Sequence, residues 1–172
     1  GMHLHAWSSP PHFDLTNDDQ NNMPFLIEYP EEIIYNKVEL LTNLLVAGNT
    51  AGNRGAGIVI HNSSFSIKNS TIVNNKANGN AGGLFVSHNT VLDVENSIFW
   101  NNSPQQVWVD DNTGNDSNTL SFSYSDVQGG ESGISTNGKG TITWGTGNID
   151  KNPSFVDSVA DNFMLADWSH LI

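Results

Sequence analysis

The stretch Asn96-Ser97-Ile98-Phe99-Trp100-Asn101-Asn102 repeats a pattern that is present twice earlier in the chain. The same pattern occurs at Asn69-Ser70-Thr71-Ile72-Val73-Asn74-Asn75, and before that at Asn43-Leu44-Leu45-Val46-Ala47-Gly48-Asn49. A second segment has the same register, because Gly55-Ala56-Gly57-Ile58-Val59-Ile60 matches Ala81-Gly82-Gly83-Leu84-Phe85-Val86 at the same offset. Two separate segments therefore share one period, which is the signature of a repeat architecture.

The length of the period predicts the architecture. Each repeat holds three short apolar stretches separated by Asn and Gly, and it has no room for three antiparallel hairpins with ordinary turns. It fits one rung of a parallel β-helix, in which equivalent residues of successive rungs stack about 4.8 Å apart. A weaker fourth copy is present at 122–127, and a degenerate fifth runs from Thr141-Ile142-Thr143-Trp144 to Leu165. We therefore predict an all-β solenoid of about five rungs over residues 38–172.

The register assigns individual residues to the interior. Aliphatic and aromatic side chains at equivalent positions should stack inward, and one such stack is Val46, Ile72 and Phe99. Two further stacks pair Ile58 with Leu84 and Ile67 with Val94. Trp100 aligns with Val73 and Ala47, which strand alternation places outward.

Asparagine recurs at the corners of the predicted rungs. Asn49, Asn75 and Asn102 share one corner, where stacked amides hydrogen-bond to one another and to the turn backbone, satisfying groups that would otherwise be buried and unpaired. Asn43, Asn69 and Asn96 give a second expected ladder. Recurrence at every rung indicates a scaffolding role for these residues.

Composition limits the functions open to this chain. The 172 residues carry a net charge of −12 and are 37 % hydrophobic, with 24 Asn, 16 Gly and no Cys. An acidic surface repels nucleic acid and anionic lipid, so we expect neither as a partner. No apolar run approaches the roughly 18 residues of a membrane helix, so membrane insertion is not expected. Asn is a poor helix former that tolerates left-handed backbone, which favours a turn-rich β protein.

The residues resemble a known superfamily. Ala81-Gly82-Gly83-Leu84, together with Phe99-x-x-Asn102 and its counterparts Ile72-x-x-Asn75 and Val46-x-x-Asn49, resembles the right-handed parallel β-helix proteins of the pectate-lyase-like superfamily, and most of all the bacterial surface and polymorphic-outer-membrane type repeats. The resemblance covers residues 38–169 and implies a right-handed solenoid in a secreted or cell-surface bacterial protein. The tail from Gly147 looks like a closing segment of these proteins, although Ser169-His170-Leu171-Ile172 departs from the usual continuation.

The segment 1–37 has no rung periodicity and contains Pro10-Pro11, Pro24 and Pro30. It is expected to be either an irregular cap over the first rung, with Phe25, Leu26 and Ile27 supplying apolar cover, or a divergent start of a longer protein. Its first residues lack the basic region and apolar core of a signal peptide. Strand edges at an uncovered end recruit other chains, so we expect self-association through the solenoid ends if 163–172 leaves the C-terminal end open.

Two enzymatic alternatives follow from the resemblance. Pectate lyases need clustered acids that hold Ca²⁺ and a basic residue that removes a proton, but Arg54 is the only Arg in the chain. Glycoside hydrolysis needs two carboxylates several ångström apart, and the adjacent Asp110-Asp111 pair points to opposite strand faces. The alternative hypothesis is a carbohydrate-active enzyme, a polysaccharide lyase or a glycoside hydrolase, or its inactive remnant. The sequence predicts no catalytic residue for it.

Four residues are candidates for ligand binding. Trp100 and Trp108 offer flat rings that stack on sugars if they are exposed; the alternative is that Trp100 packs under a loop or the C-terminal tail. His61 and His88 occupy nearly equivalent places in two successive repeats. They should therefore be neighbours on adjacent rungs, where they would bind metal, act as a base, or simply occupy polar turns.

A cation site is the remaining candidate. Asp110, Asn112 and Asp116 place oxygen ligands at alternating positions around Gly114, a spacing that suits Ca²⁺. The alternative is a polar loop whose pattern arises by chance in a chain rich in Asn and Asp.

The sequence favours a non-catalytic β-helix module with a structural or adhesive role that binds a polysaccharide or a cell-surface glycan, without a required cofactor.

Overall fold

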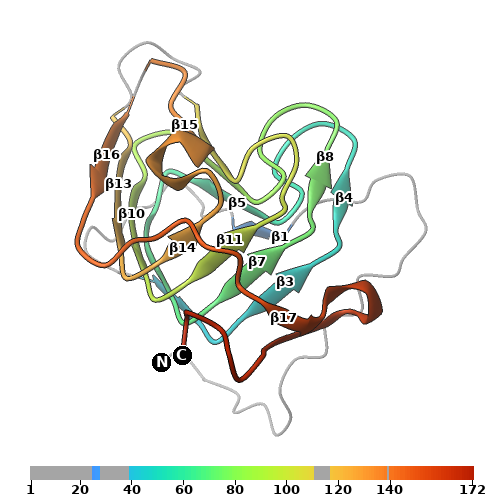
Figure 1. The fold of residues 1–172 in the computed structure, drawn as a ribbon. Coiled ribbons are helices and arrows are strands. Elements are labelled where there is room, and N and C mark those ends of the chain that lie inside the picture. The colour runs from blue at the N-terminus through green and yellow to red at the C-terminus, as the bar shows by residue number, and fades with distance from the viewer. Residues whose placement is uncertain (1–24, 28–38, 111–116, 139) are drawn as a thin grey trace, which may run out of the picture.

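The chain forms a parallel β-solenoid of about four turns, as the repeat predicts (Figure 1). The structure is a computed structural model and describes residues 25–27, 39–110, 117–138 and 140–172. Each turn contributes one strand to each of three parallel sheets, which form the walls of the solenoid. Because equivalent strands of successive turns pair with one another, every sheet holds strands that are about one period apart in the sequence.

The first sheet has the order β16-β13-β10-β6-β2, and the second has the order β14-β11-β7-β3. The strands of the first are β2 (Glu39–Thr42), β6 (Ser64–Lys68), β10 (Val91–Glu95), β13 (Thr119–Ser123) and β16 (Thr141–Trp144). Those of the second are β3 (Leu45–Ala47), β7 (Thr71–Val73), β11 (Ile98–Trp100) and β14 (Asp126–Val127).

The third sheet has the order β1-β5-β9-β12-β15 and closes each turn. Its strands are β1 (Phe25–Ile27), β5 (Ile58–His61), β9 (Leu84–Ser87), β12 (Val107–Val109) and β15 (Ile134–Ser135). A two-stranded sheet of β4 (Thr50–Ala51) and β8 (Lys76–Ala77) lies between the second and third sheets in the first two turns.

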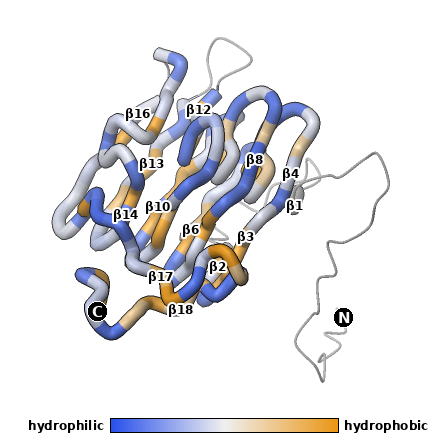
Figure 2. The backbone as a smooth tube through the Cα atoms, turned by 45° about the vertical axis from the view of Figure 1, so that its right-hand side comes forward, coloured by the Kyte–Doolittle hydropathy of each residue, from blue (hydrophilic) through white to orange (hydrophobic). Residues whose placement is uncertain are grey.

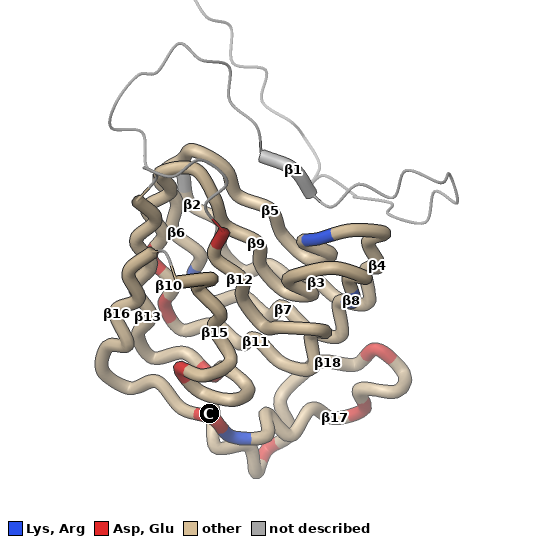
Figure 3. Tube along the Cα trace, turned by 90° about the horizontal axis from the view of Figure 1, so that it is seen from above, with Lys and Arg blue, Asp and Glu red and all other residues tan. Residues whose placement is uncertain are grey.

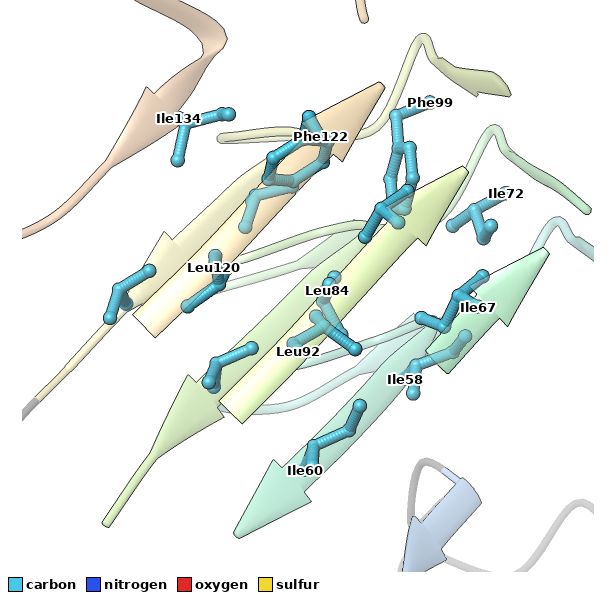
Figure 4. Packing of buried hydrophobic residues seen from close by; sticks show 14 of the residues in the cluster. Ile58, Ile60, Ile67, Ile72, Leu84, Leu92, Phe99, Leu120, Phe122 and Ile134 are labelled. Atoms are coloured by element: carbon cyan, nitrogen blue, oxygen red, sulfur yellow. The ribbon is translucent and has the colours of Figure 1, made fainter. Parts of the chain in front are cut away.

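The predicted inward stacks are confirmed. Ile72 pairs in register with Val46 on one side and Phe99 on the other. Ile58 pairs with Leu84, and Ile67 pairs with Val94. These side chains belong to one apolar cluster that fills the solenoid (Figure 4), and Figure 2 shows apolar segments along the strands with polar segments at the corners.

The buried asparagine ladder is also confirmed. The Asn75 side chain accepts a hydrogen bond from Asn49 Nδ2 (2.9 Å) and donates to Asn102 Oδ1 (2.9 Å) and to the Val46 carbonyl (2.9 Å). In the second expected ladder, Asn96 Nδ2 donates to Asn69 Oδ1 (2.7 Å). Both residues have positive φ, a conformation that Asn tolerates better than most residues.

The predicted number of rungs was slightly too high, because the fifth copy does not complete a turn. Its first part forms β16, and Ile149 then makes a single parallel bridge to Asp126. The chain next leaves the repeat for an antiparallel hairpin of β17 (Phe155–Asp157) and β18 (Asn162–Leu165). Cross-strand pairing within the hairpin replaces pairing with the previous rung.

The remaining elements are short. The 3₁₀ turns η1 (Gly130–Gly133) and η2 (Ser158–Ala160) are the helices of the described chain, and no helix in it is long and apolar enough to cross a membrane. Residues 25–27, within the segment expected to be an irregular cap, form β1, which pairs in parallel with β5. The rest of 1–37 lies outside the described residues.

Candidate functional site

The outward face of the second sheet carries Trp100. It follows Ala47 and Val73 in the register of β3, β7 and β11, and alternation turns all three away from the core. Val73 is nevertheless only 1 % exposed. A segment outside the repeat must therefore cover this part of the wall.

The cover comes from the C-terminal segment, residues 149–172. The segment is attached to the last turn where the Val127 amide donates to the Ile149 carbonyl (3.1 Å) and the Lys151 amide donates to Asp126 Oδ1 (3.0 Å). Within it, the rings of Phe155 and Phe163 meet edge to face at 5.4 Å between centroids. Figure 1 shows β17 running beside the second sheet rather than across the end of the solenoid.

A cleft opens between the second sheet and this segment, and we call it the tryptophan cleft. Its volume of about 380 Å³ lies within the range of roughly 300–1,000 Å³ that is usual for small-molecule sites. Trp100 lines it from the solenoid, and Trp168, which is 78 % exposed, lines it from the C-terminal segment. The other lining residues are Val73, Asn74, Asn101, Asn152, Ser154, Phe155 and Ser158.

A short amide ladder lies at the solenoid side of the cleft. Asn101 Nδ2 donates to Asn74 Oδ1 (2.7 Å), and the Asn101 backbone amide donates to Gln128 Oε1 (2.7 Å). Both asparagines have positive φ at the turn that follows their strand. Among the described residues, Asn74 Nδ2 and Asn101 Oδ1 have no hydrogen-bond partner, so a donor group and an acceptor atom are left for a ligand.

A buried carboxyl group lies where the C-terminal segment joins the last turn. Asp126 is 2 % exposed, and its Oδ2 has no hydrogen-bond partner in the described part of the chain. Burial, the largest effect, raises the pKa of Asp126 from 3.8 to about 6; the Lys151 amide opposes this shift, and the charge of Asp150 adds to it. The ionised form is thus disfavoured in the folded protein.

Replacing Asp126 by Asn should stabilise the fold at neutral pH. Because its pKa is higher in the folded state than in the unfolded state, the folded state takes up a proton between about pH 4 and pH 6, and stability falls as pH rises through that window. The full pKa shift corresponds to a loss of about 3 kcal/mol in the free energy of unfolding once the carboxyl group is ionised. We expect the gain of Asp126→Asn in urea denaturation to approach that size at pH 7.5 and to vanish near pH 3.5. An equal gain at both pH values would contradict this account.

The third sheet carries most of the other predicted candidates on its outer face. Phe85 is covered by the Arg54 guanidinium, 5.1 Å from the ring centroid, and Trp108 packs against the same small cluster of Val59, Ala81 and Phe85. Arg54 also pairs with Asp110 at 3.3 Å. The indole of Trp108 therefore contributes to packing, and the two charges of Arg54 and Asp110 are directed at each other.

His61 and His88 are neighbours, as their places in the repeat predict. Their ring centroids lie 5.4 Å apart in an edge-to-face arrangement. The hydroxyl of the fully buried Ser87 hydrogen-bonds to Nδ1 of both imidazoles, at 2.8 Å from His88. Nδ1 of each ring is thus directed at the same serine hydroxyl. This arrangement favours the interpretation of the two histidines as residues of a polar turn.

The predicted cation site is described only at Asp110. Its carboxylate interacts with Arg54 and, at 3.5 Å, with Asn137 Nδ2, while Asn112 and Asp116 lie outside the described residues. No group of three or more His, Asp or Glu residues that could hold a metal ion is present in the described part of the chain.

Sequence reasoning placed Trp100 correctly on the outside of the solenoid but did not find its partners. Trp168, Phe155 and Asn152 belong to the non-periodic tail, whose sequence gives no register against any rung. Asn74 and Asn101 occupy equivalent places in two successive repeats, and this signal was available in the sequence.

Comparison of the chain with protein-family models, with curated proteins and with solved structures found no match.

Proposed function

We propose that this chain is a non-catalytic, carbohydrate-binding β-solenoid module, and that the tryptophan cleft is its binding site. The observation that carries the proposal is the meeting of Trp100 and Trp168, which are far apart in the sequence, on opposite sides of one cleft. The cleft is also lined by amide side chains from the solenoid and by amide and hydroxyl side chains from the C-terminal segment.

This combination of groups suits a saccharide. The aromatic faces of Trp100 and Trp168 offer flat apolar surface for the C–H face of a sugar ring. Asn152, Ser154 and Ser158 offer donors and acceptors for its hydroxyl groups. Aromatic walls with placed polar groups that fix the orientation of the ligand are usual in small-molecule sites.

Two features support a non-catalytic role. No Asp or Glu of the described chain lines the tryptophan cleft, whereas glycoside hydrolysis needs a pair of carboxyl groups. Arg54, the only arginine and the basic residue considered for a lyase mechanism, forms an ion pair with Asp110 and stacks on Phe85. Arg54 and Asp110 therefore have each other as partners within the protein and need no substrate to balance their charges.

The finer assignment is also a proposal. We place the solenoid in the pectate-lyase-like superfamily, near the bacterial surface repeats, on the strength of the Gly-rich segment at 81–84 and the asparagine ladder. A secreted or cell-surface location and an adhesive role toward polysaccharide follow from that assignment. A chain without Cys and with a net charge of −12 is compatible with such a location.

Removing either tryptophan should abolish most of the binding. We expect isothermal titration against cellohexaose, mannohexaose, chitohexaose and hexagalacturonate to detect a ligand for the full chain, without release of new reducing ends. For that ligand, Trp100→Ala and Trp168→Ala should each weaken binding by about tenfold or more, which corresponds to about 1.4 kcal/mol.

The matched control is Tyr124→Ala, which removes a 61 % exposed aromatic side chain that does not line the cleft. Its affinity should stay within about twofold of the parent. Equal losses in all three variants would contradict the assignment of the site, and cleavage of any of the four oligosaccharides would favour the enzymatic alternative.

A further inference from the structure

We infer that the tryptophan cleft selects a neutral glycan over a uronate and holds it through the Asn74–Asn101 amide ladder. This inference rests on the proposed carbohydrate-binding function and specifies its ligand class. It is carried by the charges in and around the cleft, and by the two amide atoms that the ladder leaves without a partner.

The lining of the cleft is uncharged. None of its nine residues is Asp, Glu, Lys, Arg or His. The nearest charged residues along the chain are two acids, Asp157 next to Ser158 and Asp167 next to Trp168, and one base, Lys151 next to Asn152. Figure 3 shows acidic segments on β17, in the loop between β17 and β18, and in the chain that follows β18.

A carboxylate ligand would be disfavoured in these surroundings. To enter the cleft and stack on an indole ring it would have to give up part of its hydration, which is costly unless a cation or several donors replace the lost water. Among the described residues no cationic side chain lines the cleft, and the net charge of −12 adds repulsion. A sugar that carries only hydroxyl or acetamido groups avoids both penalties.

The amide ladder supplies positive recognition for such a sugar. Asn101 Nδ2 donates within the ladder, whereas Asn74 Nδ2 and Asn101 Oδ1 make no hydrogen bond among the described residues and are available as a donor and an acceptor. A sugar hydroxyl donates and accepts, so it can satisfy either atom. The carboxylate of a uronate only accepts, so it can use the donor of Asn74 but not the acceptor of Asn101, which is left to the hydroxyl groups that a uronate shares with a neutral sugar. Selection against a uronate therefore rests on the uncharged lining and the acidic surroundings of the cleft.

The chain contains a matched control for this ladder. Asn69 and Asn96 form the same side-chain hydrogen bond at 2.7 Å, also with positive φ, and neither residue lines the cleft. Asn101→Gly and Asn96→Gly therefore remove equivalent exposed side chains from equivalent left-handed turns. Gly adopts this conformation readily, so both variants should fold, and thermal denaturation should give them similar midpoints.

The experiment is isothermal titration of the full chain and both variants with the neutral hexasaccharides cellohexaose, mannohexaose and chitohexaose, and with hexagalacturonate. We expect the best neutral ligand to bind at least about tenfold more tightly than hexagalacturonate. Asn101→Gly should weaken neutral binding by about fivefold or more, and Asn96→Gly should change it by less than about twofold. Asn74→Gly, as a second cleft variant, should behave like Asn101→Gly.

Each negative result overturns a different claim. Tighter binding of hexagalacturonate would overturn the inference and leave the proposed carbohydrate-binding function standing. Equal affinities of Asn101→Gly and Asn96→Gly for a neutral ligand would overturn the role of the ladder. Binding of none of the four oligosaccharides would overturn the proposed function itself.

Discussion

Replacing Ile72 by Asp should destabilise the fold by at least about 4 kcal/mol, which is a large share of the roughly 5–15 kcal/mol that stabilises a typical domain. Ile72 is 0 % exposed and lies between Val46 and Phe99 in the central stack. The substitution removes apolar burial and places a carboxyl group where no partner is available. Urea denaturation at neutral pH measures the loss.

The control for this variant is Leu45→Asp. Leu45 is 57 % exposed and precedes Val46, so it faces solvent where Val46 faces the core. We expect it to change the free energy of unfolding by less than about 1 kcal/mol. A one-residue slip of the register would exchange these faces, so a larger loss for Leu45→Asp than for Ile72→Asp would show that the register is wrong.

Replacing Asn75 by Leu should cost at least about 3 kcal/mol, because it breaks the middle of the buried ladder. The side chain of Asn75 is fully buried, and its amide makes hydrogen bonds to Asn49, to Asn102 and to the Val46 carbonyl. Leu is similar in size but satisfies none of these groups. The partners remain buried or half-buried and lose the bonds that offset their desolvation.

Asn78→Leu makes the same substitution slightly further along the same turn. Asn78 is exposed, and no hydrogen bond of its side chain is present in the described part of the structure, so this change should cost less than about 1 kcal/mol. Thermal and urea denaturation of both variants give the two stability losses. Their difference is the contribution of the ladder, without the general effect of replacing Asn by Leu. Comparable losses would mean that the ladder contributes little to stability.

The repeat made most of the solenoid predictable from the sequence. A nearly constant period converts sequence spacing directly into spatial neighbours, which is why the contacts of Ile72 and Asn75 followed from the register. One further ladder shares that period and was overlooked. Ser70, Ser97 and Ser125 each accept a hydrogen bond from the backbone amide of the preceding turn, and each donates to the carbonyl two residues earlier.

The tryptophan cleft was only half predictable. Trp100 lies in the repeat, so alternation placed it on the outer wall. The position of Trp168 depends on how the C-terminal hairpin packs, and a single hairpin has no repeated register from which to infer its neighbours. The burial of Asp126 has the same origin, because the segment that covers it begins where the repeat ends.

Binding of a glycan in the cleft lined by Trp100 and Trp168 is the event on which the proposed function depends. It is tested most directly by titrating the ¹⁵N-labelled full chain with whichever neutral hexasaccharide binds most tightly and following the indole and side-chain amide resonances. We expect the indole resonances of Trp100 and Trp168 to shift together with the side-chain amide resonances of Asn74 and Asn101. The indole resonances of Trp108 and Trp144 should stay in place. Shifts centred on Trp108, or no shift at either cleft tryptophan, would contradict the proposed binding site.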